Sequence, residues 1–132
     1  SLKLGWVAIP SALIFLQAEL RISPVGMNVL LNLILHWWTQ ESKPHPSQDA
    51  MAARMGISKR TIQREIAHMV KLGVLKKHPT GIRHPQYRGR NIYDLSPLIK
   101  MLNDLSPALV YSLKKHKHHE TTQEQEQEQE QN

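Results

Sequence analysis

Cysteine is absent from the 132 residues of this chain. Its absence excludes disulfide bridges, thiolate zinc sites and cysteine nucleophiles. Long hydrophobic runs are also missing, because residues 25–38 are interrupted by Asn28, Asn32 and His36 and fall short of the ~18–20 apolar residues that a membrane span requires. No phosphate-cradling glycine-rich loop, HExxH motif or nucleophile elbow occurs. We therefore expect a protein without enzymatic activity, cofactor or bound metal, and not a membrane protein.

The N-terminal segment lacks the features of a targeting sequence. Leu2–Leu20 has no small-residue cleavage site after a basic start, so a secretory signal peptide is not expected. Together with the absence of cysteine, this favours a cytoplasmic protein. The sequence begins with Ser1 rather than Met, which is consistent with a fragment of a longer protein.

Acidic residues are scarce in the middle of the chain. The formal net charge is +6, but five of the eleven Asp and Glu lie in residues 120–132, which contain no Lys or Arg. Residues 1–119 carry all 17 Lys and Arg and six acids, a net charge of +11. Between Arg54 and Arg90 there are ten Lys or Arg and one acid, Glu65. Such a region attracts a polyanion, although an ordinary solvated basic surface has the same composition.

The N-terminal third contains one clear helix start. Residues 1–22 are apolar and contain Gly and Pro, which predicts an extended lead-in and a short helix that ends near Leu20 and packs on the domain. Ser23-Pro24 combines a good N-cap residue with proline at the first helical position. Apolar residues at helical spacing follow as far as Trp38 and predict a buried helix, and the two prolines of Thr39–Pro46 predict a loop.

The segment Ser47–Leu75 matches the helix-turn-helix pattern along its length. It predicts helices over Gln48–Met55 and from Lys59 to about Leu72, each capped by a serine and ended by a glycine. The capping serines are Ser47 and Ser58, and the terminating glycines are Gly56 and Gly73. Ala52 and Gly56 are small enough for the close approach of two helices that cross through a short turn, and Ile57 is placed to fill the gap between them.

The second of these helices has two chemically different faces. One face is apolar and predicts core packing, and it comprises Ile62, Ile66, Met69 and Val70. The other face is a row of hydrogen-bond donors on a helix of the right size for a major groove, and it comprises Lys59, Arg60, Thr61, Gln63, Arg64, His68 and Lys71. A plain helical hairpin with a solvated face explains the periodicity but not the near absence of acids, since solvated faces normally mix both signs.

Two extended runs, Val74–His78 and Asn91–Leu95, flank the Gly-, Pro-, Arg- and His-rich segment Pro79–Arg90 and predict a β-hairpin with a flexible loop. Two further Ser-Pro pairs predict helices over Leu98–Asn103 and from Ala108 to about Lys115. The Gln-Glu repeat of residues 118–132 cannot bury apolar surface and predicts disorder, or at most a transient helix.

Residues 6–96 resemble a winged helix-turn-helix DNA-binding domain, of the subgroup found in plasmid and phage replication proteins and bacterial transcription regulators. The resemblance lies in Trp6–Pro10, in the Ser23-Pro24 helix and in Asn91–Leu95, besides the helix-turn-helix itself. It implies a mainly α fold with a small β-hairpin wing, and binding to double-stranded DNA in transcription regulation or in plasmid DNA replication. The expected parts are a lead-in (1–22), the winged core (23–96), a C-terminal helical extension (97–117) and a disordered tail (118–132).

Chemistry suggests roles for most candidate residues on the helix that starts at Lys59, which is the third helix of the winged core. Arg60 and Arg64 lie four residues apart and each suits guanine O6 and N7, whereas Gln63 suits adenine. Lys59 and Lys71 are placed for non-specific phosphate contacts. Ser58 and Thr61 have hydroxyl groups at the helix N-terminus, which suit either a phosphate contact or simple capping.

In the wing, arginines surround a single tyrosine. Arg83, Arg88 and Arg90 are candidate readers of a narrow minor groove. Tyr87 suits stacking or a phosphate bond, or equally the packing of the wing on the body. Farther along, the imidazoles of His116–His119 suit a metal, but without carboxylates around them a solvated basic segment is favoured.

Alternatives to a DNA-binding dimer are distinguishable by exposed residues. A protein-interaction module requires apolar residues between the charges of the third helix, where only Ala67 qualifies. Binding of RNA or single strands requires several exposed aromatics, and the basic region offers Tyr87 and at most Tyr93. One winged helix covers few base pairs, so a homodimer is expected. The apolar C-terminal run either forms its interface or packs back on the core, and it comprises Leu102, Leu105, Leu109, Val110 and Leu113.

Overall fold

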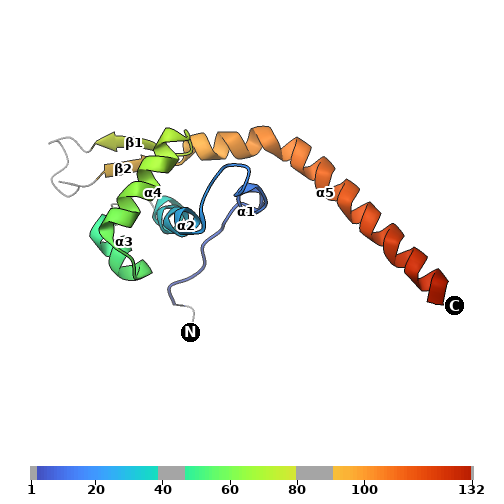
Figure 1. Ribbon diagram of the computed structural model, residues 1–132. Coiled ribbons are helices and arrows are strands. Elements are labelled where there is room, and N and C mark those ends of the chain that lie inside the picture. Colours follow the sequence, from blue (N-terminus) through green and yellow to red (C-terminus); the bar gives the residue numbers. More distant parts are fainter. Residues whose placement is uncertain (1–2, 39–46, 80–90, 132) are drawn as a thin grey trace.

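The computed structural model describes residues 3–38, 47–79 and 91–131 (Figure 1). In chain order its elements are α1 (Ser11–Leu16), α2 (Pro24–Trp38), α3 (Gln48–Met55), α4 (Lys59–Lys71), β1 (Lys76–Pro79), β2 (Asn91–Asp94) and α5 (Ser96–Gln131). A mostly helical body with one two-stranded antiparallel hairpin confirms the predicted winged helix-turn-helix fold class. The predicted loops at 39–46 and 80–90 lie outside the described residues.

Helix α2 begins where the Ser-Pro signal predicts. The hydroxyl of Ser23 accepts a hydrogen bond from the backbone N–H of Gly26 at 2.9 Å, which satisfies one of the orphan donors of the first turn. Helices α2, α3 and α4 contact one another, and their buried side chains form one core with residues from α1, the hairpin and the start of α5. Helix α1 is shorter than predicted and ends at Leu16, but its Leu13 and Leu16 are buried in that core.

The helix-turn-helix follows the predicted capping residues. Ser47 accepts from the N–H of Ala50 at 3.0 Å and starts α3. Gly56 ends α3 with φ of 69°, a left-handed conformation that a side chain disfavours. Helix α3 therefore has its predicted bounds, and α4 ends at Lys71 with Leu72 as its C-cap, one residue before the predicted limit.

The hairpin is shorter than the two extended runs. Val74 and Leu75 were expected in the first strand, but they are buried in the connection after α4, and β1 starts at Lys76. The strands pair with Lys76 opposite Asp94 and Lys77 opposite Tyr93. Residues directly opposite each other share a face of the sheet, and Tyr93 is only 2% exposed, so the Lys77 side of β1 is the face turned toward the helical body.

The C-terminal region is the largest correction to the sequence-based expectation. One continuous helix, Ser96–Gln131, replaces the two predicted helices and the disordered tail. Ser106 does not cap a new helix, because its hydroxyl donates to the carbonyl of Leu102 one turn earlier. Pro107 therefore lies inside α5, where its missing N–H and its ring favour a bend such as the one visible along this helix (Figure 1). Gln and Glu are good helix formers, which explains the continuation through the repeat.

Asp94 ties the hairpin to the start of α5. Its Oδ1 accepts from the backbone N–H of Ser96 at 2.8 Å, and its Oδ2 lies 3.7 Å from Nε2 of His78. Hydrogen bonds from the Ser96 side chain and backbone, with a smaller contribution from His78, lower the pKa of the Asp94 carboxyl group. The folded protein therefore favours ionised Asp94 more than the unfolded chain does. The resulting contribution to the free energy of unfolding is present above the pKa of Asp94 in the unfolded chain and is lost as the pH falls through its pKa in the folded protein.

Substitution of Asp94 with asparagine is expected to lower the free energy of unfolding by about 0.5–1 kcal/mol at pH 7, because the carboxylate is exchanged for a neutral acceptor at a partly exposed site. The difference from wild type should shrink as the pH falls below about 4, where wild-type Asp94 becomes protonated. Urea denaturation at pH 7 and pH 3 measures both values. Asp104→Asn, an exposed change on α5, is the control, and a gap that stays constant with pH would contradict the prediction.

Candidate nucleic-acid interface

Helix α4 buries one side and exposes the other. Ile62, Ile66 and Met69 are buried against the rest of the domain, and Val70 is half-buried beside them. With 13 residues, α4 is about 20 Å long. Its exposed side is a nearly straight line of side chains that comprises Arg60, Arg64, Ala67 and Lys71.

The three cations of that line have no partner among the described residues. Arg60, Arg64 and Lys71 follow one another at spacings of four and seven residues, which places them on one side of the helix over about 16 Å. Within the described parts of the chain, none of the three has an ion-pair or hydrogen-bond partner. Their charges are therefore available to a ligand without breaking an existing contact.

Glu65, the one acid of the basic region, is turned away from this line. Its Oε2 accepts from the hydroxyl of Ser23 at 2.8 Å, next to the N-terminus of α2, where the helix dipole favours a negative charge. A Cβ on Gly26 would lie 3.1 Å from the same carboxylate oxygen, so glycine makes room for this contact. Helical periodicity gave no sign of this bond, since its partners lie 42 residues apart.

Two other cations are engaged in contacts within the domain. Lys59 Nζ lies 3.3 Å from Asp49 Oδ2, an exposed ion pair between the first turns of α4 and α3. Arg54 donates from Nη1 to Oδ1 of the buried Asn32 at 2.8 Å and so links α3 to α2. Lys59 stays on the predicted face, but its charge is shared with a carboxylate, unlike that of Lys71.

The remaining candidates lie at the N-terminus of α4 and on its two flanks. Ser58 caps the helix, because its Oγ accepts from the N–H of Thr61 at 3.1 Å and lies 2.9 Å from the Thr61 hydroxyl. The imidazole Nε2 of His68 lies 3.1 Å from the carbonyl oxygen of Arg21, in the connection before α2. The structure thus places His68 toward the lead-in, whereas Gln63 lies on the opposite flank, toward α3 and the hairpin.

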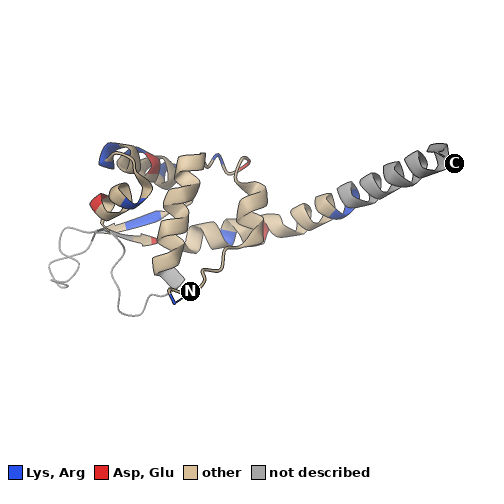
Figure 2. Ribbon diagram, turned by 90° about the horizontal axis from the view of Figure 1, so that it is seen from below, with Lys and Arg blue, Asp and Glu red and all other residues tan. Residues whose placement is uncertain are grey.

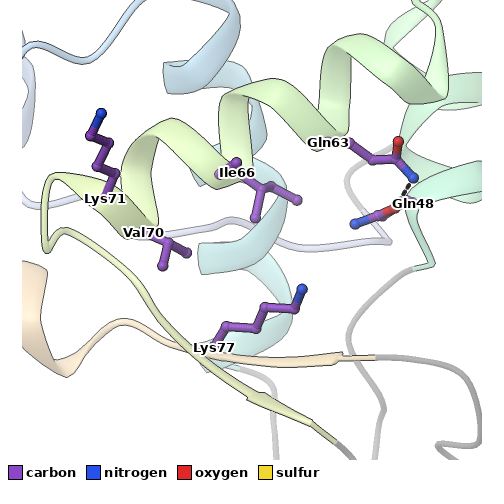
Figure 3. Close-up of a pocket in the computed structure, with 7 residues that line it drawn as sticks. Gln48, Gln63, Ile66, Val70, Lys71 and Lys77 are labelled. Atoms are coloured by element: carbon purple, nitrogen blue, oxygen red, sulfur yellow. Dashed lines mark hydrogen bonds between the residues drawn. The ribbon is translucent and has the colours of Figure 1, made fainter.

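A groove of about 560 Å³ separates that second flank of α4 from α3 and β1 (Figure 3). It is lined by Gln48, Gln63, Ile66, Ala67, Val70, Lys71 and Lys77. Figure 3 shows Lys77 reaching from β1 toward the helix, and Gln63 meeting Gln48 through a hydrogen bond of 3.1 Å. Gln48 and Lys77 were not among the predicted site residues. Lys77 pairs with the buried Tyr93, and this pairing places Lys77 on the face of the hairpin that is turned toward the helices.

The wing residues Arg83, Tyr87, Arg88 and Arg90 lie outside the described residues, as do the side chains of His116–His119. Strand β1 ends at Pro79 and β2 begins at Asn91, on either side of the segment that the sequence predicts to be the wing. In Figure 2, blue Lys and Arg segments lie on α4, on β1 and along α5, with red acids only interspersed.

Helices α2–α4, the short α3–α4 turn and the hairpin define a winged helix-turn-helix. A protein-family model described as a helix-turn-helix domain matches residues 20–75, from the connection before α2 to the residue before β1. Residues 20–75 are thus similar to a helix-turn-helix domain, in agreement with the observed fold. No curated protein matches the chain. None of the helices in the described ranges combines the length and hydrophobicity needed to cross a bilayer.

Proposed function

We propose that this chain binds specific sequences of double-stranded DNA by placing α4 in the major groove. The observation that carries the proposal is the line of Arg60, Arg64 and Lys71, which have no partner in the described ranges and lie on a helix whose only acid is bonded elsewhere. A major groove about 12 Å wide admits one such helix, and guanidinium groups along it reach guanine edges. Phosphates attract the remaining cations and supply the affinity that is independent of sequence.

The groove beside α4 suits the DNA backbone. Lys77 reaches into it from β1, and Lys71 borders it on the helix with its ammonium group directed outward (Figure 3). Half-buried Val70 lines it between them. With α4 in the major groove of DNA and the wing at an adjacent minor groove, the sugar-phosphate backbone between these two DNA grooves would pass between α4 and the wing. The two lysines then contribute phosphate contacts rather than base readout.

The competing functions receive less support from the same residues. On the exposed line of α4 only Ala67 is apolar, whereas a protein-interaction helix needs larger apolar contacts there. Tyr93, one of two aromatics that base stacking would use, is buried and hydrogen-bonded. Duplex DNA therefore remains the favoured partner over a protein or a single strand.

The biological role that we propose is transcription regulation or the DNA-binding step of a plasmid or phage replication initiator. It rests on the resemblance of residues 6–96 to domains of those proteins. We also propose that the chain acts by binding alone and not as an enzyme, since its candidate site consists of exposed cations and amides.

We further propose that two copies dimerise through α5. Leu102, which was a candidate interface residue, is buried in the core and Leu109 is half-buried against it. Leu105, Val110 and Leu113 remain 36%, 48% and 37% exposed on a helix that runs away from the body (Figure 1).

Selection of bound duplexes from a random pool, followed by titration of the best duplex against a scrambled one, tests DNA binding. We expect a common motif, and an affinity for either duplex that falls steeply with salt as counterions are released. No enriched motif together with a flat salt response would overturn the proposal.

Sedimentation equilibrium tests the dimer. The full chain is expected to sediment as a dimer at micromolar concentrations, and the double variant Val110→Glu, Leu113→Glu as a monomer that still folds. The control, Asp104→Asn, should remain dimeric. A monomeric wild type would contradict the proposed interface but not the proposed DNA binding.

A further inference from the structure

A chain of hydrogen bonds crosses from the hairpin to the exposed flank of α4. Nε2 of Gln48 donates to the hydroxyl of Tyr93 at 3.3 Å, and Oε1 of Gln48 accepts from Nε2 of Gln63 at 3.1 Å. The three residues belong to β2, α3 and α4 and lie at least 15 positions apart in the sequence. Figure 3 shows the Gln48–Gln63 contact at one end of the groove beside α4.

This contact determines which groups Gln63 offers to a ligand. A glutamine amide has two N–H donors and one carbonyl acceptor. One N–H of Gln63 is used by Gln48, which leaves one donor and one acceptor. Adenine presents in the major groove the matching pair, the N7 acceptor and the N6 amino donor, and a bidentate contact needs both.

Gln48 is itself held in place. It is half-buried in the first turn of α3, directly after the capping residue Ser47, and its amide is bonded to the hydroxyl of Tyr93, which is buried. Gln63 is exposed, and without a partner its long side chain would sample many rotamers and both amide orientations. Because Gln48 Oε1 can only accept, it selects the orientation in which Nε2 of Gln63 faces α3.

We infer that Gln48 is a positioning residue for base readout, which fixes the Gln63 amide so that it recognises adenine. The inference rests on the proposed function, since it requires α4 to lie in the major groove. Gln48 need not touch DNA in this role. Gln48 restricts the conformations of the Gln63 side chain before binding. Less conformational entropy of Gln63 is therefore lost when the complex forms.

The experiment uses the full chain and the duplex selected from a random pool, with each base pair of the motif changed in turn. Gln63→Ala identifies the base pair that Gln63 reads, as the position where the preference for A·T disappears. Gln48→Met, of similar size but without an amide, is expected to reduce the preference at that same position by about 3- to 10-fold. Affinity for a scrambled duplex should stay unchanged. Gln17→Met, a change of the same type on the connection after α1, is the control and should alter neither value.

A second variant separates positioning from general damage to the domain. In Gln48→Glu, a carboxylate accepts from Nε2 of Gln63 and from the Tyr93 hydroxyl, so the preference at that position should be retained. Its negative charge should weaken binding to all duplexes alike. Unchanged preference in Gln48→Met, or an equal loss of preference in Gln48→Glu, would overturn the inference while leaving DNA binding intact. A wild type that discriminates between no duplexes would overturn the proposed function itself.

Discussion

Replacing Arg64 with alanine is expected to weaken binding to the selected duplex by about 10- to 100-fold and to remove the preference for one G·C base pair. Arg64 lies at the centre of the exposed line of α4 and has no partner within the described residues, so its guanidinium group is free to fork onto guanine O6 and N7. The side chain is exposed, so the free energy of unfolding should change by less than about 0.5 kcal/mol. Fluorescence anisotropy with duplexes that differ at single base pairs measures the preference.

Lys71→Ala provides the comparison for Arg64→Ala, because both remove an exposed cation from the same helix face. A lysine that contacts phosphate should weaken every duplex by a similar factor and make the salt dependence shallower by about one unit of slope. Equal weakening of all duplexes by Arg64→Ala would instead show that Arg64 contacts the backbone. The assignment of α4 to the major groove would then be wrong.

Replacing Ile62 with alanine is expected to lower the free energy of unfolding by about 2–5 kcal/mol. Ile62 is 0% exposed and anchors α4 in the core shared with α2 and α3, so truncation leaves a cavity in addition to losing apolar burial. The free energy of unfolding of a native domain is about 5–15 kcal/mol in total, so this substitution should remove a large fraction of it. Urea denaturation followed by far-ultraviolet circular dichroism measures the loss.

Ala67→Ser is the control for Ile62→Ala, since it changes an exposed position of the same helix and should shift stability by less than about 0.5 kcal/mol. A loss below about 1 kcal/mol in Ile62→Ala would mean that the site collapses around the missing atoms, which a core of this packing should not allow. DNA binding by the folded fraction of the variant is expected to be retained, because Ile62 does not face the exposed line.

The helix-turn-helix was predictable because its signals are local. Ser47 and Gly56 act on backbone groups within one turn of themselves, so the sequence alone determines where α3 starts and ends. The Ser-Pro pair is a weaker signal, since its meaning depends on what precedes it. Ser23-Pro24 follows a non-helical connection and starts α2, whereas Ser106-Pro107 follows a helix that is already formed and only bends α5.

The exposed line of α4 was predictable from periodicity, but the pairing of its neighbours was not. Nothing in the order of residues shows that Lys59 meets Asp49 while Lys71 meets no partner among the described residues. The Glu65–Ser23 and Gln48–Tyr93 bonds join residues 42 and 45 positions apart. Such contacts depend on how the helices cross, which the packing of the whole core decides.

Helix α4 is hydrogen-bonded to the rest of the domain on both flanks, and these bonds restrict its rotation about its own axis. On one side Gln63 is bonded to α3, and on the other Glu65 and His68 are bonded to the residues around the start of α2. A helix held by apolar packing alone slides and rolls more easily, because dispersion contacts have little directionality. With its roll fixed, α4 presents the same side chains in the free and bound protein. We therefore expect changes in the target sequence to alter mainly the dissociation rate rather than the association rate.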